Sequence, residues 1–97
     1  MILEVATLDI TPGQNAEFEA AFQRGAVHIK AAKGCRSVSL RRCVEKDNRY
    51  LLQVEWDTLE NHTVDFRSSE AFQKGWRANV GPFFSGTPTV EHYSLVG

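Results

Sequence analysis

The spacing of apolar residues along the 97-residue chain switches between steps of two and steps of three or four. Steps of two are typical of strands, and steps of three or four are typical of amphipathic helices. Residues 2–10 are rich in β-branched and apolar side chains and are expected to form a strand, which Thr11-Pro12-Gly13 ends. Thr11 is expected to cap a helix and Gly34 to end it. The apolar face of this helix consists of Phe18, Phe22, Ala26, Ile29 and Ala32.

The second half of the chain begins with two alternating segments, 36–45 and 49–56, joined by a polar turn, which predicts an antiparallel hairpin. A short helix should start near Asp57-Thr58, and Ser68-Ser69 should break it and cap another. Residues 88–96 are expected to form the last strand. The order β-α-β-β-α-α-β predicts a single domain, 1–97, with the α+β ferredoxin-like fold, in which helices cover one face of a four-stranded antiparallel sheet.

The other face of that sheet also carries apolar residues. Leaving them uncovered would expose an apolar patch, so we expect a homodimer in which two sheets pack face to face. The alternative is a second face that water solvates through Gln53, Glu55 and nearby arginines. The apolar set on this face is Leu3, Val5, Leu51, Tyr93 and Leu95.

Charge and cysteine content narrow the class of protein. Eleven Lys and Arg against twelve Asp and Glu give a net charge of −1, which argues against nucleic acid or an anionic membrane as partner. No signal peptide or apolar span is evident, so a reducing cytoplasm is expected. Cys35 and Cys43 would lie ~26 Å apart in one strand, too far for a disulfide. No zinc-type Cys or His spacing is present, and no metal site is expected.

Three segments carry a family resemblance: residues 2–13, the FEAAF run at 18–22, and residues 54–76, which contain VEW, FRSS and the last tryptophan. Together they resemble the antibiotic biosynthesis monooxygenase (ABM) domain family over nearly the whole chain. The resemblance implies a dimeric α+β barrel. It also implies chemistry of the kind seen in members that oxidise quinols or polycyclic phenols without metal, flavin or haem, although other members degrade haem.

His62 is the candidate catalytic residue. It shares a helix face with Leu59 and Phe66, so its imidazole should point at the sheet. Cofactor-free oxygenation begins by deprotonating a phenol or hydroquinone, and a positioned base supplies that step. The alternative is a core histidine bonded to a backbone carbonyl. Asp65 could orient His62, and His92 is expected to be structural unless it enters the pocket or the dimer interface.

Aromatic side chains are abundant on the predicted helices and strands, and flat rings suit a planar substrate. The competing interpretation is that rings at helical spacing simply fill the core. The residues expected to bind substrate are Trp56, Phe66, Trp76, Phe83 and Tyr50.

The sequence therefore predicts a cofactor-independent monooxygenase whose partners are O₂ and a small aromatic quinol or phenol. The alternative is a non-catalytic dimer that binds a small ligand or serves a structural role. A haem-degrading relative fits less well. That branch uses an asparagine on the first strand, a tryptophan and a haem-ligating histidine, where this chain has Thr7 and Asp9, Phe66 and Trp76.

Overall fold

The computed structural model describes all residues 1–97, and the predicted order of elements is confirmed. Two helical segments, η1 and η2, are π-helical, and η3 is a 3₁₀ turn. The elements are β1 (Ile2–Asp9), α1 (Asn15–Lys30), β2 (Cys35–Arg42), β3 (Arg49–Trp56), η1 (Asn61–Phe66), η2 (Ala71–Arg77), α2 (Ala78–Val80), η3 (Gly81–Phe83) and β4 (Thr89–Ser94).

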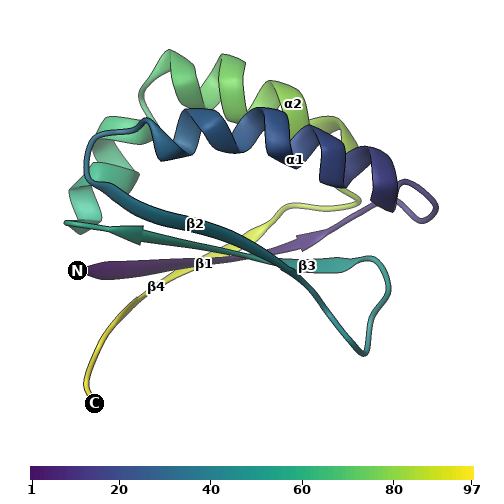
Figure 1. Ribbon diagram of the computed structural model, residues 1–97, viewed down its shortest axis with the longest axis horizontal. Helices are drawn as coiled ribbons and strands as arrows, with labels where there is room; N and C mark the ends of the chain where they lie inside the picture. Colours follow the sequence, from purple (N-terminus) through teal and green to yellow (C-terminus); the bar gives the residue numbers. More distant parts are fainter.

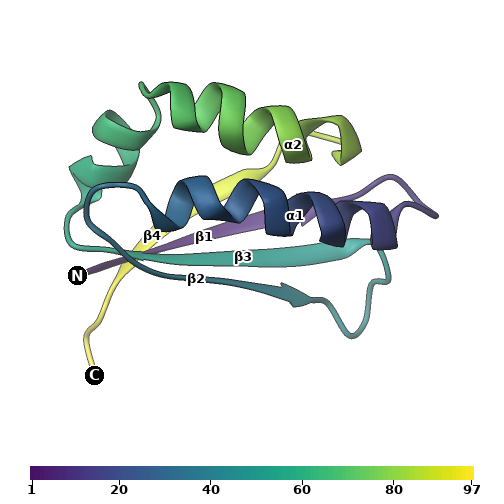
Figure 2. The same cartoon turned by 45° about the horizontal axis from the view of Figure 1, so that its top comes forward.

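The four strands form one antiparallel sheet in the order β2-β3-β1-β4. All the helices lie on one face of this sheet, and the other face is bare (Figures 1 and 2). This is the predicted α+β ferredoxin-like arrangement. Because β1 lies between β3 and β4, its residues 2–7 have a partner on both sides; Glu4 is opposite Val54 on β3 and His92 on β4.

The core lies between the sheet and the helices. The predicted alternation of β3 is confirmed, because Tyr50, Leu52, Val54 and Trp56 are all buried. On α1 the buried face includes Phe18, Phe22, Ala26 and Ile29, also as predicted. Burial of each large apolar side chain stabilises the fold by ~1.5–3 kcal/mol. η2 and α2 pack beside α1, so the helices form one layer over this face of the sheet (Figures 1 and 2).

Both predicted boundaries of the first helix are wrong in detail. Gln14 rather than Thr11 precedes α1, and the Thr11 hydroxyl donates to the Phe83 carbonyl, 3.2 Å away. The helix ends at Lys30, four residues before Gly34. Gly34 instead makes the turn into β2, where its φ of +81° is costly for any other residue. A glycine after a helical pattern therefore marked the following turn and not the helix end.

The bare face of the sheet has the predicted mixture of apolar and polar side chains. Leu3, Val5 and Leu51 are half-buried by their neighbours within the chain, and Tyr93 is exposed. Leu95 does not belong to this face as predicted, since β4 ends at Ser94. None of the helices has the length and apolar character needed to cross a membrane.

Candidate active site

Four side chains from four elements meet where the sheet faces η1. Glu4 comes from β1, Trp56 from the end of β3, His62 from η1 and His92 from β4. Glu4 and His92 face each other across the β1–β4 ladder. Only 6% of Glu4 and 3% of His62 is exposed, whereas His92 is half-buried. Glu4 and His62 are thus ionisable groups inside the core of a small domain, and half-buried His92 connects them to the edge of that core.

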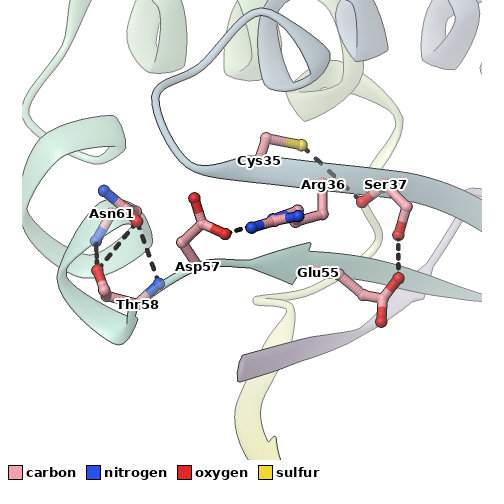
Figure 3. Close-up of polar contacts among 7 residues, drawn as sticks. All are labelled: Cys35, Arg36, Ser37, Glu55, Asp57, Thr58 and Asn61. Carbon is pink, nitrogen blue, oxygen red and sulfur yellow. Dashed lines mark hydrogen bonds and ion pairs between the residues drawn. The ribbon is translucent and has the colours of Figure 1, made fainter. Parts of the chain in front are cut away.

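The start of the helix that carries His62 is fixed by a reciprocal pair of hydrogen bonds (Figure 3). The Asn61 backbone N–H donates to Thr58 Oγ1 at 3.2 Å, and the Thr58 N–H donates to Asn61 Oδ1 at 3.1 Å. This arrangement has the logic of a capping box. A Cβ on Gly34 would lie 2.1 Å from Asn61 Oδ1, so the turn into β2 has to be a glycine for Asn61 to occupy this place.

Two polar contacts tie the start of β2 to the end of β3 and the residue after it, beside this helix start, as Figure 3 shows. Arg36 forms an ion pair with Asp57, and the Ser37 hydroxyl donates to Glu55 Oε1 at 2.6 Å. The ladder shifts register by a bulge between Cys35 and Ser37. All four polar side chains are solvent-accessible, so each contact contributes ~0–1 kcal/mol. Their effect is to position the connection that leads to His62.

His62 lies between a ring and two polar partners. Its imidazole stacks on Trp56, with ring centroids 5.4 Å apart and planes 15° apart. Nδ1 is 2.8 Å from His92 Nε2, and Nε2 is 3.4 Å from Glu4 Oε1. Burial, followed by the positive charge of Arg67 and the neighbouring His92, lowers the pKa of His62 from 6.5 to about 4. His62 is therefore a neutral imidazole at pH 7.

Glu4 and His92 are shifted in opposite directions by the same surroundings. Burial raises the pKa of Glu4, opposed by a hydrogen bond from Trp56 Nε1 to Oε1 at 2.9 Å and by the charge of Arg67. Burial and Arg67 lower the pKa of His92. Arg67 thus acts on all three groups. It follows η1 directly, where its N–H donates to the His62 carbonyl at 3.1 Å, an i to i−5 bond of the π-helix. Such π-helical turns are frequent at functional sites.

A cavity of about 990 Å³ opens beside this cluster, between the sheet, η2 and residues 81–88. Glu4 and His62 form part of its wall, together with two cationic side chains, Arg67 and Arg77. Its apolar wall includes Ala6, Leu8, Leu52, Phe72, Trp76, Phe84 and Val90. The space has the size of a small-molecule site and the expected mixture of apolar walls and a few polar groups.

The structure brings some of the predicted site residues together and separates others. His62 and Trp76 line the cavity. Trp56 and Phe66 do not line it but pack around His62, with centroids 5.4 and 6.5 Å from the imidazole. Tyr50 lies under α1, where its hydroxyl donates to Glu19 at 2.6 Å. Phe83 packs against Phe18 at 6.2 Å, so neither of the last two predicted residues reaches the cavity.

The sequence analysis placed neither Glu4 nor Arg67 at the candidate site. The alternation of Glu4 with Ala6 and Leu8 puts it on the buried face of β1. His92 was expected to be structural unless it enters the pocket; it contacts His62 but does not line the cavity. Asp65, considered as an orienting partner, accepts a hydrogen bond from Asn61 Nδ2 at 3.2 Å. Nothing in the sequence pattern pointed to Arg67, because its position near Glu4 and His62 depends on the π-helical turn that follows His62.

The fold and the site define a class: a small α+β ferredoxin-like domain that holds a ligand-sized cavity between its helices and its sheet. The sequence model of the antibiotic biosynthesis monooxygenase family matches residues 1–78, which is most of the chain. The chain therefore belongs to the antibiotic biosynthesis monooxygenase (ABM) family, and the resemblance seen in the sequence is confirmed.

Individual relatives agree with this assignment. YczJ of Bacillus subtilis (strain 168), an uncharacterized protein, is 45% identical over 96 residues, covering 99% of this chain and 100% of YczJ. A crystal structure from Bordetella bronchiseptica, assigned to the antibiotic biosynthesis monooxygenases, is 42% identical with a TM-score of 0.94, covering 98% and 96% of the two chains. SnoaB, a cofactor-independent oxygenase from Streptomyces nogalater, is 19% identical with a TM-score of 0.81, covering 97% and 91%, and shows likeness of fold alone.

Proposed function

We propose that the protein is a cofactor-independent monooxygenase that oxidises a small aromatic phenol or quinol in the cavity between helices and sheet. The observation that carries this proposal is the composition of the cavity wall. Aromatic rings, Phe72, Trp76 and Phe84, line the same space as a buried pair of ionisable groups, Glu4 and His62. A planar phenol fits between the rings with its hydroxyl at the polar end.

The chemistry asks little of the protein besides a proton acceptor and a positive charge. Removing the hydroxyl proton gives an electron-rich phenolate that reduces O₂. Phenol plus O₂ gives quinone plus water, so atoms and electrons balance with the substrate as the only reductant. The proton acceptor is one of the two neighbouring groups Glu4 and His62, of which the sequence analysis had considered only His62 as the general base. Arg67, whose charge acts on both groups, stabilises the developing phenolate.

The functional unit of this proposal is a homodimer. The helices of one chain leave one sheet face bare (Figure 2). Half-buried Leu3, Val5 and Leu51 lie on that face, because they alternate with the buried residues of β1 and β3. Packing two such faces together removes an apolar patch from water. The cavity opens on the opposite, helix-covered side of the sheet, so a sheet-to-sheet dimer leaves it accessible.

The test is oxygen consumption by the purified, chelator-treated protein with a panel of hydroquinones and polycyclic phenols. The proposal expects uptake of one O₂ per phenol oxidised and loss of that uptake when Trp76 is replaced by alanine. Tyr50→Phe is the matched control, because Tyr50 is equally aromatic but lies outside the cavity. Uptake by no member of the panel, or equal uptake by the Trp76 variant, contradicts the proposal.

A second candidate function is non-catalytic binding of a small aromatic ligand. It is favoured by the engagement of both His62 nitrogens, because a fully partnered imidazole is what a packing residue would show. Binding of a panel phenol that quenches tryptophan fluorescence, without O₂ uptake, is the result that selects this function over the first.

A further inference from the structure

Glu4 stands out among the residues that face the helices from the sheet. The next positions with the same orientation are Ala6 and Leu8 on β1 and Ile10 directly after it, all buried and apolar. A carboxylate at such a place costs free energy unless its charge is compensated. Only 8% of the Glu4 side chain is exposed, and it lines the cavity. The position therefore calls for a reason other than packing.

The two oxygens of this carboxylate have different surroundings. Oε1 accepts a hydrogen bond from Trp56 Nε1 at 2.9 Å and also lies 3.4 Å from His62 Nε2. Both nitrogens are therefore near the same oxygen, the Trp56 Nε1 by a hydrogen bond and the His62 Nε2 by a longer ion-pair contact. Oε2 has no hydrogen-bond partner within the protein. Every side-chain nitrogen or oxygen that is fully buried in this chain has one, so Oε2 is not fully buried and is open to the cavity that Glu4 lines.

His62 offers no comparable free atom. A neutral imidazole carries one N–H and one lone pair. If the N–H is on Nε2, it lies on the side of the Glu4 carboxylate, whose Oε1 is 3.4 Å from Nε2, and Nδ1 accepts from His92 Nε2, 2.8 Å away. The opposite tautomer would direct a lone pair at a carboxylate oxygen 3.4 Å away, which is electrostatically unfavourable. The first arrangement leaves no His62 lone pair for a substrate.

We propose that Glu4 is the catalytic residue that accepts the substrate's hydroxyl proton, at Oε2, while Trp56 and His62 are positioning residues that hold Oε1. The inference rests on the proposed function and deepens it. In the step, the phenol O–H bond breaks, an O–H bond forms on Glu4 Oε2, and the electron pair stays on the phenolate oxygen. His62 stays neutral throughout, and its N–H and the Trp56 N–H fix the carboxylate.

The charges around Glu4 suit this role. From η1 and the residue after it, His62 and Arg67 face the carboxylate; from β4 comes His92, and from the start of β2 the Cys35 thiol. Arg77 lines the far side of the same cavity. Burial raises the pKa of Glu4, which makes its carboxylate a stronger base toward a phenol than an exposed glutamate. Arg67 then compensates the phenolate that forms.

The arrangement of protons can be tested without any turnover. Imidazole ¹⁵N chemical shifts, recorded between pH 5 and 8, should show His62 as the neutral tautomer with its proton on Nε2. In protein carrying ¹³C in the glutamate carboxyl groups, saturating hydroquinone should move the Glu4 resonance, identified by its absence from Glu4→Gln. A proton on His62 Nδ1, or a Glu4 resonance that ignores bound hydroquinone, overturns the inference.

Kinetics then separates Glu4 from His62. Glu4→Gln keeps the size of the side chain and an oxygen for the Trp56 bond, and should lower kcat at least 100-fold with little change in KM. His62→Gln can still donate to Glu4 and should lose no more than 10-fold. Glu19→Gln, a glutamate that binds the Tyr50 hydroxyl outside the cavity, is the matched control. Equal activity of the Glu4 and Glu19 variants, or a larger loss at His62 than at Glu4, refutes the assignment.

A pH profile tests the positioning role of Trp56. Its hydrogen bond lowers the pKa of Glu4, so Trp56→Phe should move the acidic limb of kcat/KM to higher pH. An unmoved limb contradicts the role. If the wild-type protein oxidises no phenol of the panel, the proposed function fails and the catalytic role of Glu4 fails with it. Oxidation by the wild type that persists in Glu4→Gln overturns the assignment of Glu4 alone. Circular dichroism of each variant distinguishes lost chemistry from lost structure.

Discussion

The burial of His62 makes the stability of the fold depend on pH in a way that can be worked out in advance. Burial, then the charge of Arg67 and the neighbouring His92, lower the pKa of His62 to about 4, against 6.5 for an unperturbed imidazole. A histidine with a lowered pKa is neutral in the fold at pH values where the unfolded chain binds a proton. Its contribution to stability is therefore complete above pH 6.5 and is lost as the pH falls toward 4.

The difference between 6.5 and about 4 corresponds to on the order of 3 kcal/mol. Glu4 works in the opposite direction, because burial raises its pKa and protonation in acid relieves the buried charge. The wild-type curve alone therefore mixes two effects. Comparison with His62→Gln isolates the first, since glutamine does not titrate and can occupy the same place beside Glu4 and His92.

The assay is urea unfolding followed by far-ultraviolet circular dichroism, at fixed protein concentration, in half-unit steps from pH 4 to 7.5. Between pH 6.5 and 4 the wild-type protein should lose about 3 kcal/mol more free energy of unfolding than His62→Gln. Parallel curves for the two proteins would refute the reasoning, because they would mean that His62 titrates alike in the folded and unfolded chains.

Three further predictions concern the fold and its assembly. Gly34→Ala should lower the free energy of unfolding by about 2–3 kcal/mol, because it adds a Cβ 2.1 Å from Asn61 Oδ1 at a positive φ; Gly86→Ala, at an open position, is the control in the same urea titration. Tyr50→Phe should lower the free energy of unfolding by ~0.5–1.5 kcal/mol, because the hydrogen bond to Glu19 is lost. The affinity for phenols, measured by fluorescence titration, should not change, and a weaker affinity would contradict the place of Tyr50 outside the cavity. Light scattering should give about twice 10.9 kDa for the wild type and 10.9 kDa for Val5→Lys, and a wild-type mass of 10.9 kDa at micromolar concentration would exclude the dimer.

Local patterns were sufficient wherever a side chain's surroundings follow from its own element. Alternation in β3 correctly placed Tyr50 and Trp56 on the buried face, and helical spacing placed Phe18 among the core residues. The break at Ser68-Ser69 was also readable, because the Ser69 hydroxyl accepts a hydrogen bond from the Phe72 N–H at 3.2 Å and so caps the following segment. Periodicity and capping are properties of a few neighbouring residues, which is why one sequence reveals them.

For the same physical reason, the sequence predicted only part of the candidate site. His62 shares an inward face with Phe66, as its spacing predicted, but Leu59, predicted on the same face, is exposed. The spacing could not place His62 beside His92, which is thirty residues away in sequence. Whether Tyr50 or Trp76 lines a cavity depends on how far α1 and η2 each stand from the sheet. No local spacing encodes that distance.

The sequence by itself determined the order of elements, the inward face of each strand and helix, and the membership of a family, because these depend on the chemistry of neighbouring residues. Only the tertiary structure decided which polar groups share the interior. The β1–β4 register brings His92 opposite Glu4, and the π-helical turn after His62 brings Arg67 to both. Pairing of strands distant in sequence sets these contacts, and with them the neutral state of His62 and the open oxygen of Glu4.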